Sequence, residues 1–357
     1  MLSFLQSFDK RAAFVGLSGA AIVSLSIVVG SRGLRDYDPA LLPYTFGVVF
    51  AVFAVAYRYA VWLQRPPTAV YWRRGWQLLF RRGHVLNNLA FLARSVYDNL
   101  FAQRFIQRRS SKRWVAHFCF AWGCVLAGAV TFPLVFGWLH FDTRMDDPHW
   151  YQVVLFGMVM HEFHTESLMR YVMFNLLNVS AVLVIFGASL ALQRRLSNPG
   201  SLARQQYGND IVPLVLLLAI SLTGLMLTFS MHWLHGYGYS AMSLIHALIV
   251  TTTLLYLPFG KFFHIFQRPA QLSVGFYRRA DEASPPHVCR TCGEGFAGSQ
   301  HVRDLKQVLK EVDLDWQIDE ESHYADVCPR CRRRLLGFTQ GRVIGRSGSR
   351  GDVSEEV

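Results

Sequence analysis

Long apolar blocks dominate most of this chain. Six stretches, near 12–30, 44–63, 114–139, 168–192, 211–233 and 241–263, each approach or exceed the roughly 20 mostly apolar residues that a helix needs to cross a bilayer. The pattern predicts an all-α integral membrane helical bundle of about six transmembrane helices. Residues 150–160 are also apolar but too short to cross, so we expect a helical run along the outer face that leads into the fourth span.

Changes in composition divide the chain into five segments. We expect an N-terminal transmembrane hairpin over 1–64, a basic amphipathic connection over 65–113 and a four-helix transmembrane core over 114–268. Within the connection, residues 84–108 have the spacing of an interfacial or docking helix. A small polar module follows over 269–339, and the Gly/Ser/Arg-rich segment 340–357 is typical of a disordered tail.

The charged residues predict how the chain lies in the membrane. Only 17% of residues are charged, against roughly 25% in an average soluble domain, which argues against a cytosolic globular protein. The excess of 36 Lys+Arg over 24 Asp+Glu lies mainly in the connections and the tail, and residues 65–113 hold a single acid, Asp98. The positive-inside rule then predicts a multi-pass protein of the cytoplasmic (inner) membrane with both termini and the small module cytoplasmic, and no nucleic-acid partner.

Histidines at membrane depth are the first candidates for chemistry. His246 and His264 are 18 residues apart. On one continuous helix this spacing is five whole turns, which puts both side chains on one face about 27 Å apart along the axis. Such a helix would supply an axial imidazole to each of two haems stacked across the bilayer. A helix-capping or interface role is the alternative for any single histidine.

Each haem needs a second imidazole from a facing helix. His117, at the cytoplasmic end of the third span, is expected to lie level with His264, and Arg113 and Lys261 are close enough in sequence to meet the haem propionates. For His246 the partner is less defined, and we rank His164 and His161 ahead of the other outer histidines, which are His232 and His235.

The run from His246 to His264, with Pro258-Phe-Gly-Lys261 inside it, resembles the membrane cytochrome b (gamma) subunit of respiratory nitrate reductase. It is equally similar to relatives in heterodisulfide-reductase-like and sulfite-reduction-linked complexes. The basic approach to His117 fits the same pattern, and the resemblance covers about residues 70–268. It implies haem b held by His117 and His264, an outer haem that uses His246, and quinol oxidised near the outer haem with electrons passing inward to an iron–sulfur subunit.

One position departs from that family. Its members carry another histidine ten residues after the one that matches His117, and here that position is Ala127. The outer haem therefore either takes its second ligand from another helix or has been lost. The sequence leaves both one haem b and two as alternatives.

Four cysteines in the polar module predict a metal site. Cys289 and Cys292 form one Cys-x-x-Cys pair and Cys328 and Cys331 form another, which is enough for one tetrahedral site, with a short helix expected between the pairs. Structural zinc is the first interpretation, and a rubredoxin-like iron is the alternative. Cys119 and Cys124, on an apolar helix, are read as packing residues.

Together these features predict a haem b membrane anchor that transfers electrons between the quinone/quinol pool and the iron–sulfur and catalytic subunits of a membrane-bound oxidoreductase. The catalytic centre would lie on another subunit. Protons released by quinol would be accepted on the outer side, where the sequence offers His161, Glu162, His164 and Glu166, residues that would equally suit a polar helix start. The alternatives are a non-redox scaffold that recruits a soluble partner through its zinc module, or a transporter.

Overall fold

The structure is a computed structural model that describes residues 9–197, 200, 203, 205–314, 316–319 and 322–348. The chain forms two compact units. The first comprises Met1–Trp62 and Arg94–Pro269, and the second comprises Leu63–Ala93 and Ala270–Val357. The basic connection predicted over 65–113 is thus divided between the two units.

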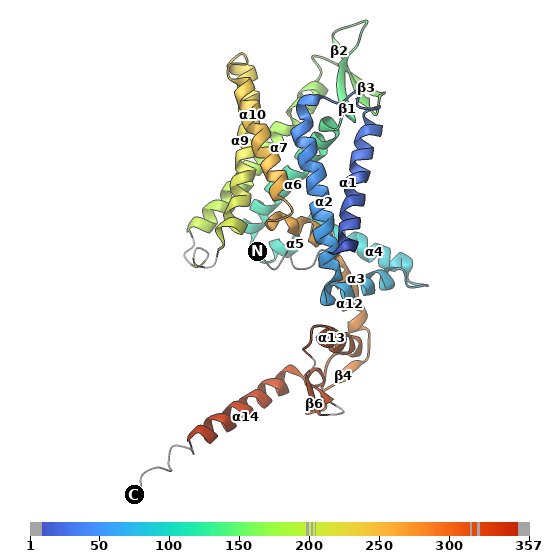
Figure 1. Ribbon diagram of the computed structural model, residues 1–357, viewed down its shortest axis with the longest axis vertical. Coiled ribbons are helices and arrows are strands. Elements are labelled where there is room, and N and C mark those ends of the chain that lie inside the picture. Colours follow the sequence, from blue (N-terminus) through green and yellow to red (C-terminus); the bar gives the residue numbers. More distant parts are fainter. Residues whose placement is uncertain are drawn as a thin grey trace. The chain divides into compact units, whose positions relative to one another are not determined.

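Six helices of the first unit, in the part of the chain that the structure describes, are long and apolar enough to cross a membrane (Figure 1). This agrees with the predicted number of spans and favours a multi-pass membrane protein. The helices are α1 (Lys10–Gly30), α2 (Leu42–Gln64, preceded by the short helix η2, Pro39–Leu41), α6 (Ser111–Val135), α7 (Leu168–Ser197), α9 (Val212–Trp233, preceded by η4, Tyr207–Ile211) and α10 (Tyr239–Tyr256).

The sixth span ends earlier than the sequence indicated. Helix α10 stops at Tyr256, and the chain continues as η5 (Lys261–Phe263) and α11 (His264–Ala270). Pro258 lacks the N–H that a continuing helix would use, and Gly260 adopts an extended conformation with ψ −165°. A Cβ on Gly260 would fall 2.2 Å from the Tyr256 ring, so only glycine fits this turn. The single continuous helix that was to align His246 with His264 is therefore a wrong prediction.

The segment predicted as a helical run over 150–160 is instead part of a sheet. Strands β1 (Leu139–Thr143), β2 (Trp150–Leu155) and β3 (Met158–His164) pair antiparallel in that order. Positive φ angles at Phe156 (52°) and Gly157 (78°) make the tight turn between β2 and β3. In Figure 1 the sheet lies at the end of the bundle opposite α5 (Arg104–Gln107).

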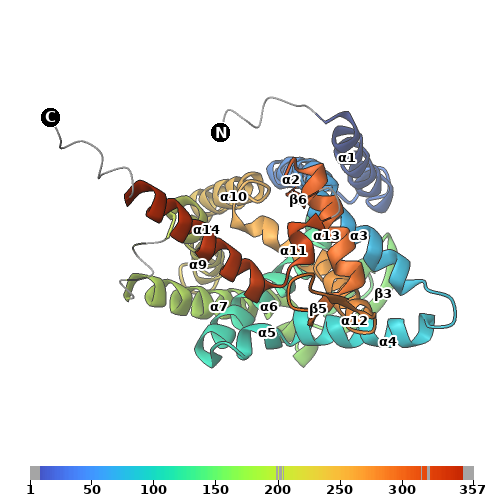
Figure 2. The ribbon, with the colours of Figure 1, turned by 90° about the horizontal axis from the view of Figure 1, so that it is seen from below.

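Helices α6, α7, α9 and α10 pack against one another in that sequence and form an arc when viewed from below (Figure 2). The α6–α7 contact is the closest, because glycines let the two backbones approach. A Cβ on Gly187 would lie 2.4 Å from the carbonyl oxygen of Ala116, and one on Gly123 would lie 2.9 Å from that of Ser180. Small residues serve this purpose in membrane bundles, where van der Waals contact replaces the hydrophobic driving force.

The second unit combines helices with two small antiparallel sheets. Helix α3 (Pro66–Leu79) packs against α12 (Leu272–Glu282) and α13 (Ser299–Glu311), and α13 confirms the helix predicted between the cysteine pairs. The remaining elements are α4 (Val85–Val96), β4 (Pro286–Val288), β5 (Gly295–Gly298), β6 (Gln317–Asp319), β7 (Ser322–His323), η6 (Tyr324–Asp326) and α14 (Pro329–Gly348).

Two further expectations need correction. The helix expected over 84–108 is interrupted, because α4 passes into the π-turn η3 (Tyr97–Phe101) and Gln103 then takes a left-handed conformation with φ 52°. The tail expected to be disordered from 340 is helical as far as Gly348, since α14 continues to that residue. Residues 349–357 lie outside the described part of the chain.

The close α6–α7 contact predicts a difference between two glycine substitutions. Gly187→Ala would push the two backbones apart and lower the free energy of unfolding by about 1–3 kcal/mol. Gly128→Ala, on α6, meets only the Phe132 ring at 3.4 Å and should leave stability unchanged or slightly raised, because alanine favours helix. Thermal unfolding of both variants in detergent tests this, and equal stability of the two would contradict it.

Candidate functional site

His117 is held in one orientation by a residue outside its own helix. Ser110 caps α6 by accepting a hydrogen bond from the Arg113 N–H, and His117 follows in the second turn. Its Nδ1 lies 2.8 Å from Oε1 of Gln103, which is a buried side chain. An amide oxygen can only accept, so Nδ1 carries the proton and the lone pair of Nε2 stays available.

His264 has the same ring arrangement at the start of α11. Its Nδ1 donates to the backbone carbonyl of Lys261, which again leaves the Nε2 lone pair available. His264 and Arg268 are close enough to His117 for their charges to act on it. The two histidines predicted as a pair are thus near enough for their charges to interact, although His117 lies on the apolar helix α6 and His264 on a separate short helix.

His246 on α10 faces α9. Its Nδ1 is 2.9 Å from Oγ1 of Thr223, whose own hydroxyl donates to the Ala219 carbonyl at 2.7 Å. Because the hydroxyl proton is committed to Ala219, Thr223 accepts from His246 Nδ1–H, and Nε2 is the available nitrogen. Gly224 lies beside the ring, since a Cβ there would be 3.5 Å from His246 Cε1.

The outer histidines lie on β3 and not on the fourth span. His161 is exposed, and His164 stacks on His149 with ring centroids 6.0 Å apart. The Glu166 backbone N–H donates to His164 Nδ1 at 3.2 Å, so the tautomer of His164 is opposite to that of the three histidines above. Glu162 accepts from Gln152 at 2.7 Å and pairs with Arg144 at 3.5 Å.

The two cations expected near the inner histidines differ in their surroundings. Lys261 pairs with Asp210 at 2.5 Å, and Arg195 reaches the same carboxylate at 3.0 Å. This ion-pair cluster joins α7, the start of α9 and the turn after α10. The exposed Arg113 lies near enough to Arg194 for the two positive charges to act on each other. Lys261 is thus committed to a carboxylate, whereas Arg113 adds to a positive region.

The four cysteines converge on one point. Their sulfur atoms all lie within 4.8 Å of one another, and the sulfurs of Cys292 and Cys328 are 3.8 Å apart. Tetrahedral thiolates at a zinc–sulfur distance of about 2.3 Å would be separated by about 3.8 Å, so the cluster has the size of a metal site. The first pair lies on the turn between β4 and β5, where Gly293 takes φ +74°, and the second pair leads into α14.

Backbone groups favour negative charge at Cys289, whereas burial and the neighbouring thiols raise the pKa of Cys331. The Cys328 N–H donates to Sγ of Cys289 at 3.2 Å, and the Cys331 N–H donates to Sγ of Cys328 at 3.4 Å. Although burial opposes ionisation of Cys289, backbone N–H groups, that of Cys328 first, lower the pKa of its thiol to about 6. Thiolates gathered at this distance repel one another, and a bound cation removes that repulsion.

Asp326 links the elements that carry the two cysteine pairs. Its carboxylate accepts from His287 Nε2 at 2.9 Å, from Lys306 Nζ at 2.7 Å and from the His323 N–H at 3.1 Å. Burial opposes its ionisation, but these donors, Lys306 above all, lower the pKa of the carboxyl. The Arg290 N–H also donates to the Asp326 carbonyl at 3.1 Å, which joins the two cysteine-bearing turns directly.

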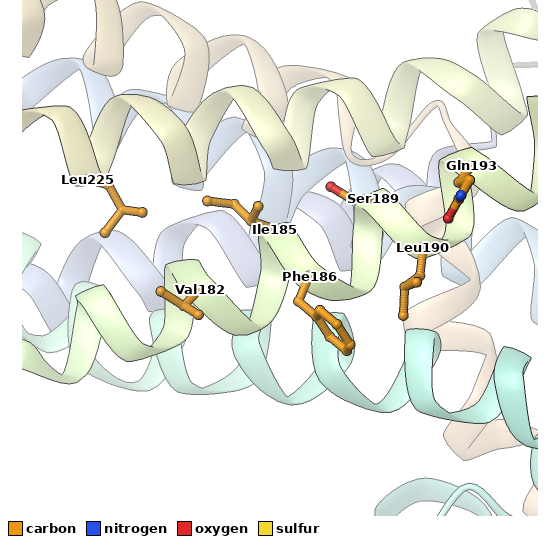
Figure 3. Close-up of a pocket in the computed structure, with 7 residues that line it drawn as sticks. All are labelled: Val182, Ile185, Phe186, Ser189, Leu190, Gln193 and Leu225. Atoms are coloured by element: carbon orange, nitrogen blue, oxygen red, sulfur yellow. The ribbon is translucent and has the colours of Figure 1, made fainter.

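An open apolar hollow of about 670 Å³ lies along α7 and α9 (Figure 3). Its wall consists mainly of α7 side chains such as Phe186 and Leu190, with Leu225 contributed by α9. None of its lining residues is a predicted site residue, so the hollow is separate from the histidines.

Sequence reasoning missed the residues that orient the histidines. Gln103 and Thr223 lie 14 and 23 residues from the rings they hold, and no local pattern marks them. Asp326 could have been noticed, because it is an acid two residues before the second cysteine pair.

Comparisons of the chain with known protein families, with curated proteins and with solved structures found no match.

The four-cysteine cluster predicts one metal ion per chain. Cys328→Ser removes a buried ligand and should abolish retention of that ion, as measured by elemental analysis of the purified full chain. Cys124→Ser, on the apolar helix α6, is the matched control and should leave the metal content unchanged. Absence of metal from the wild type purified without chelators would refute the site.

Proposed function

We propose that this protein is a haem b membrane anchor that carries electrons between the quinone/quinol pool and a partner iron–sulfur or catalytic subunit. One observation carries the proposal. His117, His264 and His246 each hold Nδ1–H against an oxygen acceptor and keep the Nε2 lone pair available. This is the donor set that axial ligation of haem iron requires.

The surroundings of these histidines support the same proposal. His117 and His246 lie on the two apolar spans that bury the least of their surface in the protein, so the helix faces around them are not sealed by packing. His117 and His264 come from different elements yet are near enough for their charges to interact, which an inner pair of ligands requires. The likeness of the His246–His264 run to nitrate reductase gamma subunits points in the same direction.

In this proposal the residues of the chain have distinct roles. A haem would supply reversible one-electron chemistry at its iron. Gln103 and the Lys261 carbonyl fix the ring tautomers of His117 and His264. Arg268, whose charge acts on His117, and Arg113, about one helical turn before His117 on α6, offer positive charge for acidic groups of the cofactor. Lys261 positions the turn after α10 through Asp210 and does not serve as a free cation.

The outer part of the site holds His246 and the histidine-bearing sheet. The exposed His161 on β3 is the proton acceptor that best suits quinol oxidation, because His164 and Glu162 are already engaged in hydrogen bonds. His246 provides one ligand of an outer haem. For the second ligand of that haem, His164 stays the first candidate predicted from the sequence.

The four-cysteine module is proposed to hold structural zinc. Zinc favours four thiolates in a closed tetrahedral site, and the Asp326 contacts tie the two cysteine-bearing turns together. A red, iron-containing preparation would instead identify a rubredoxin-like centre.

The haem proposal predicts haem b bands in the reduced-minus-oxidised absorption spectrum of the purified protein. His117→Ala and His264→Ala should each abolish the same bands, since both remove a ligand of one haem. His84→Ala, which changes an exposed histidine of the second unit, should leave the spectrum unchanged.

Two results would contradict this. Wild-type protein without haem b bands would leave the four-cysteine scaffold as the better account of the chain. Loss of different bands in the two variants would separate His117 from His264, provided that both variants elute as the wild type does in size-exclusion chromatography.

Gln103 is predicted to act through His117. Gln103→Asn tolerates the left-handed backbone but is too short to reach the ring, so Nδ1–H loses its acceptor. Without it the imidazole is a poorer donor, which should weaken haem retention by about 10–100-fold and raise the midpoint potential of the remaining haem. Gln107→Asn on α5 is the matched control. Equal potentials in the two variants would remove Gln103 from the site.

A further inference from the structure

Helix α3 has two very different faces. The inner face packs on the rest of the second unit, with Val70 and Leu79 buried and a Cβ on Gly75 falling only 2.4 Å from Ser273. The Tyr71 ring meets Tyr277 edge-on at 5.0 Å. These contacts fix the rotation of α3 about its axis, so the residues on its opposite face are set outward.

The outer face carries a ladder of aromatic rings. Trp72 and Trp76 pack edge-to-face at 5.5 Å, and Trp76 and Phe80 stack at 5.8 Å with only 7° between their planes. Trp76 is 47% exposed and Phe80 is 60% exposed. Leu86, at the start of α4 six residues after Phe80, is another exposed apolar side chain, with 82% of its surface accessible. Rings that contact one another on a surface form a continuous patch, which differs from isolated exposed residues.

Arginines border this ladder of rings, and the surrounding stretch of sequence contains no acidic residue. Between Leu63 and Ala93 the sequence has five arginines and neither Asp nor Glu. Arg74 points to the inner face, where it pairs with Asp304 at 3.0 Å. Arg73, Arg81 and Arg82 are exposed, and within the described residues they form no ion pair.

The place of α3 in the chain indicates what this face meets. Only Arg65 separates the last residue of α2, an apolar helix long enough to cross a bilayer, from Pro66 at the start of α3. The segment therefore begins at a membrane boundary. Trp rings settle at the level of lipid headgroups, and arginines bind their phosphates.

We propose that the face formed by Trp72, Trp76, Phe80, Arg73, Arg81 and Arg82, here named the aromatic–arginine face, binds anionic phospholipid at the membrane surface. The three rings enter the boundary between headgroups and acyl chains, while the three guanidinium groups contact phosphates. Phosphatidylglycerol fits this face better than a zwitterionic lipid, because the three guanidinium groups attract its net negative charge and residues 63–93 hold no carboxylate that could pair with a choline group.

The test measures how many phospholipid molecules the full-length protein retains. The protein is equilibrated in mixed micelles with phosphatidylglycerol or phosphatidylcholine, and the lipid that coelutes with it is quantified by mass spectrometry. The wild type should retain phosphatidylglycerol in preference. The triple variant Arg73→Gln, Arg81→Gln, Arg82→Gln should bind it roughly 100-fold more weakly, about fivefold for each arginine.

A matched triple variant removes the same charge elsewhere. Arg330→Gln, Arg333→Gln, Arg334→Gln changes exposed arginines of α14 and should retain phosphatidylglycerol as the wild type does. Trp76→Ser with Phe80→Ser tests the apolar half of the face and should also weaken retention, whereas Phe338→Ser on α14 should not.

Three outcomes would overturn the proposal. Equal retention by the wild type and the Arg73 triple variant would leave this face for a protein partner. Equal losses in both arginine variants would mean attraction by net charge alone. Displacement of the lipid by glycerol phosphate at equal concentration would mean a site for free phosphate. The Arg73 triple variant should keep the haem spectrum of the wild type. A failure of the lipid proposal can therefore be told apart from a failure of the haem proposal.

Discussion

The position of His264 depends on the break after α10, where Pro258 and Gly260 end the helix and an arginine from α2 supplies a hydrogen bond. A helix that ends leaves its last carbonyl groups without partners inside the helix, and an unpaired carbonyl is costly wherever water does not reach it. Arg58, from α2, donates to the carbonyl of Pro258, and its guanidinium lies 4.2 Å from the centre of the Phe263 ring. The Tyr256 hydroxyl donates to the Gly208 carbonyl at 2.5 Å, which ties the end of α10 to the start of the preceding helix. These contacts let the chain change direction, and His264 takes its position from that change.

The six long apolar helices could be predicted because hydropathy is averaged over many residues. A block of about 20 apolar residues is seldom anything other than a membrane-spanning helix. The break could not, since Leu257-Pro-Phe-Gly260 keeps the apolar character of its neighbours and hydropathy does not register a missing N–H. The sheet of β1, β2 and β3 could not be predicted for a related reason. Residues 150–160 are apolar throughout, and a short apolar run does not distinguish strand from helix. The Phe156–Gly157 turn was the signal that would have separated them.

Of the two candidate sites, the cysteine cluster could be predicted from the sequence and the orientation of the histidines could not. Two Cys-x-x-Cys pairs carry their geometry in their own spacing, so the cluster could be predicted from local sequence and its cysteines do converge. The histidines could be nominated by residue type and depth alone. Their orientation depends on Gln103, Thr223 and the Lys261 carbonyl, and the first two of these meet their rings only after distant segments have packed. The proximity of His117 and His264 was expected for a straight helix and arises instead from a bent one.

The acceptors of the three ring protons have one property in common: an amide, a hydroxyl and a backbone carbonyl are all electrically neutral. A carboxylate in any of these places would hold the ring equally well but would bring a full negative charge into a poorly solvated layer, where it would need its own counter-ion. Because the acceptors are neutral, they fix the tautomer of each imidazole without the desolvation penalty of a buried carboxylate. The formal charges that a group bound at Nε2 would meet therefore come from neighbouring cations such as Arg268, and not from the acceptors that orient the rings.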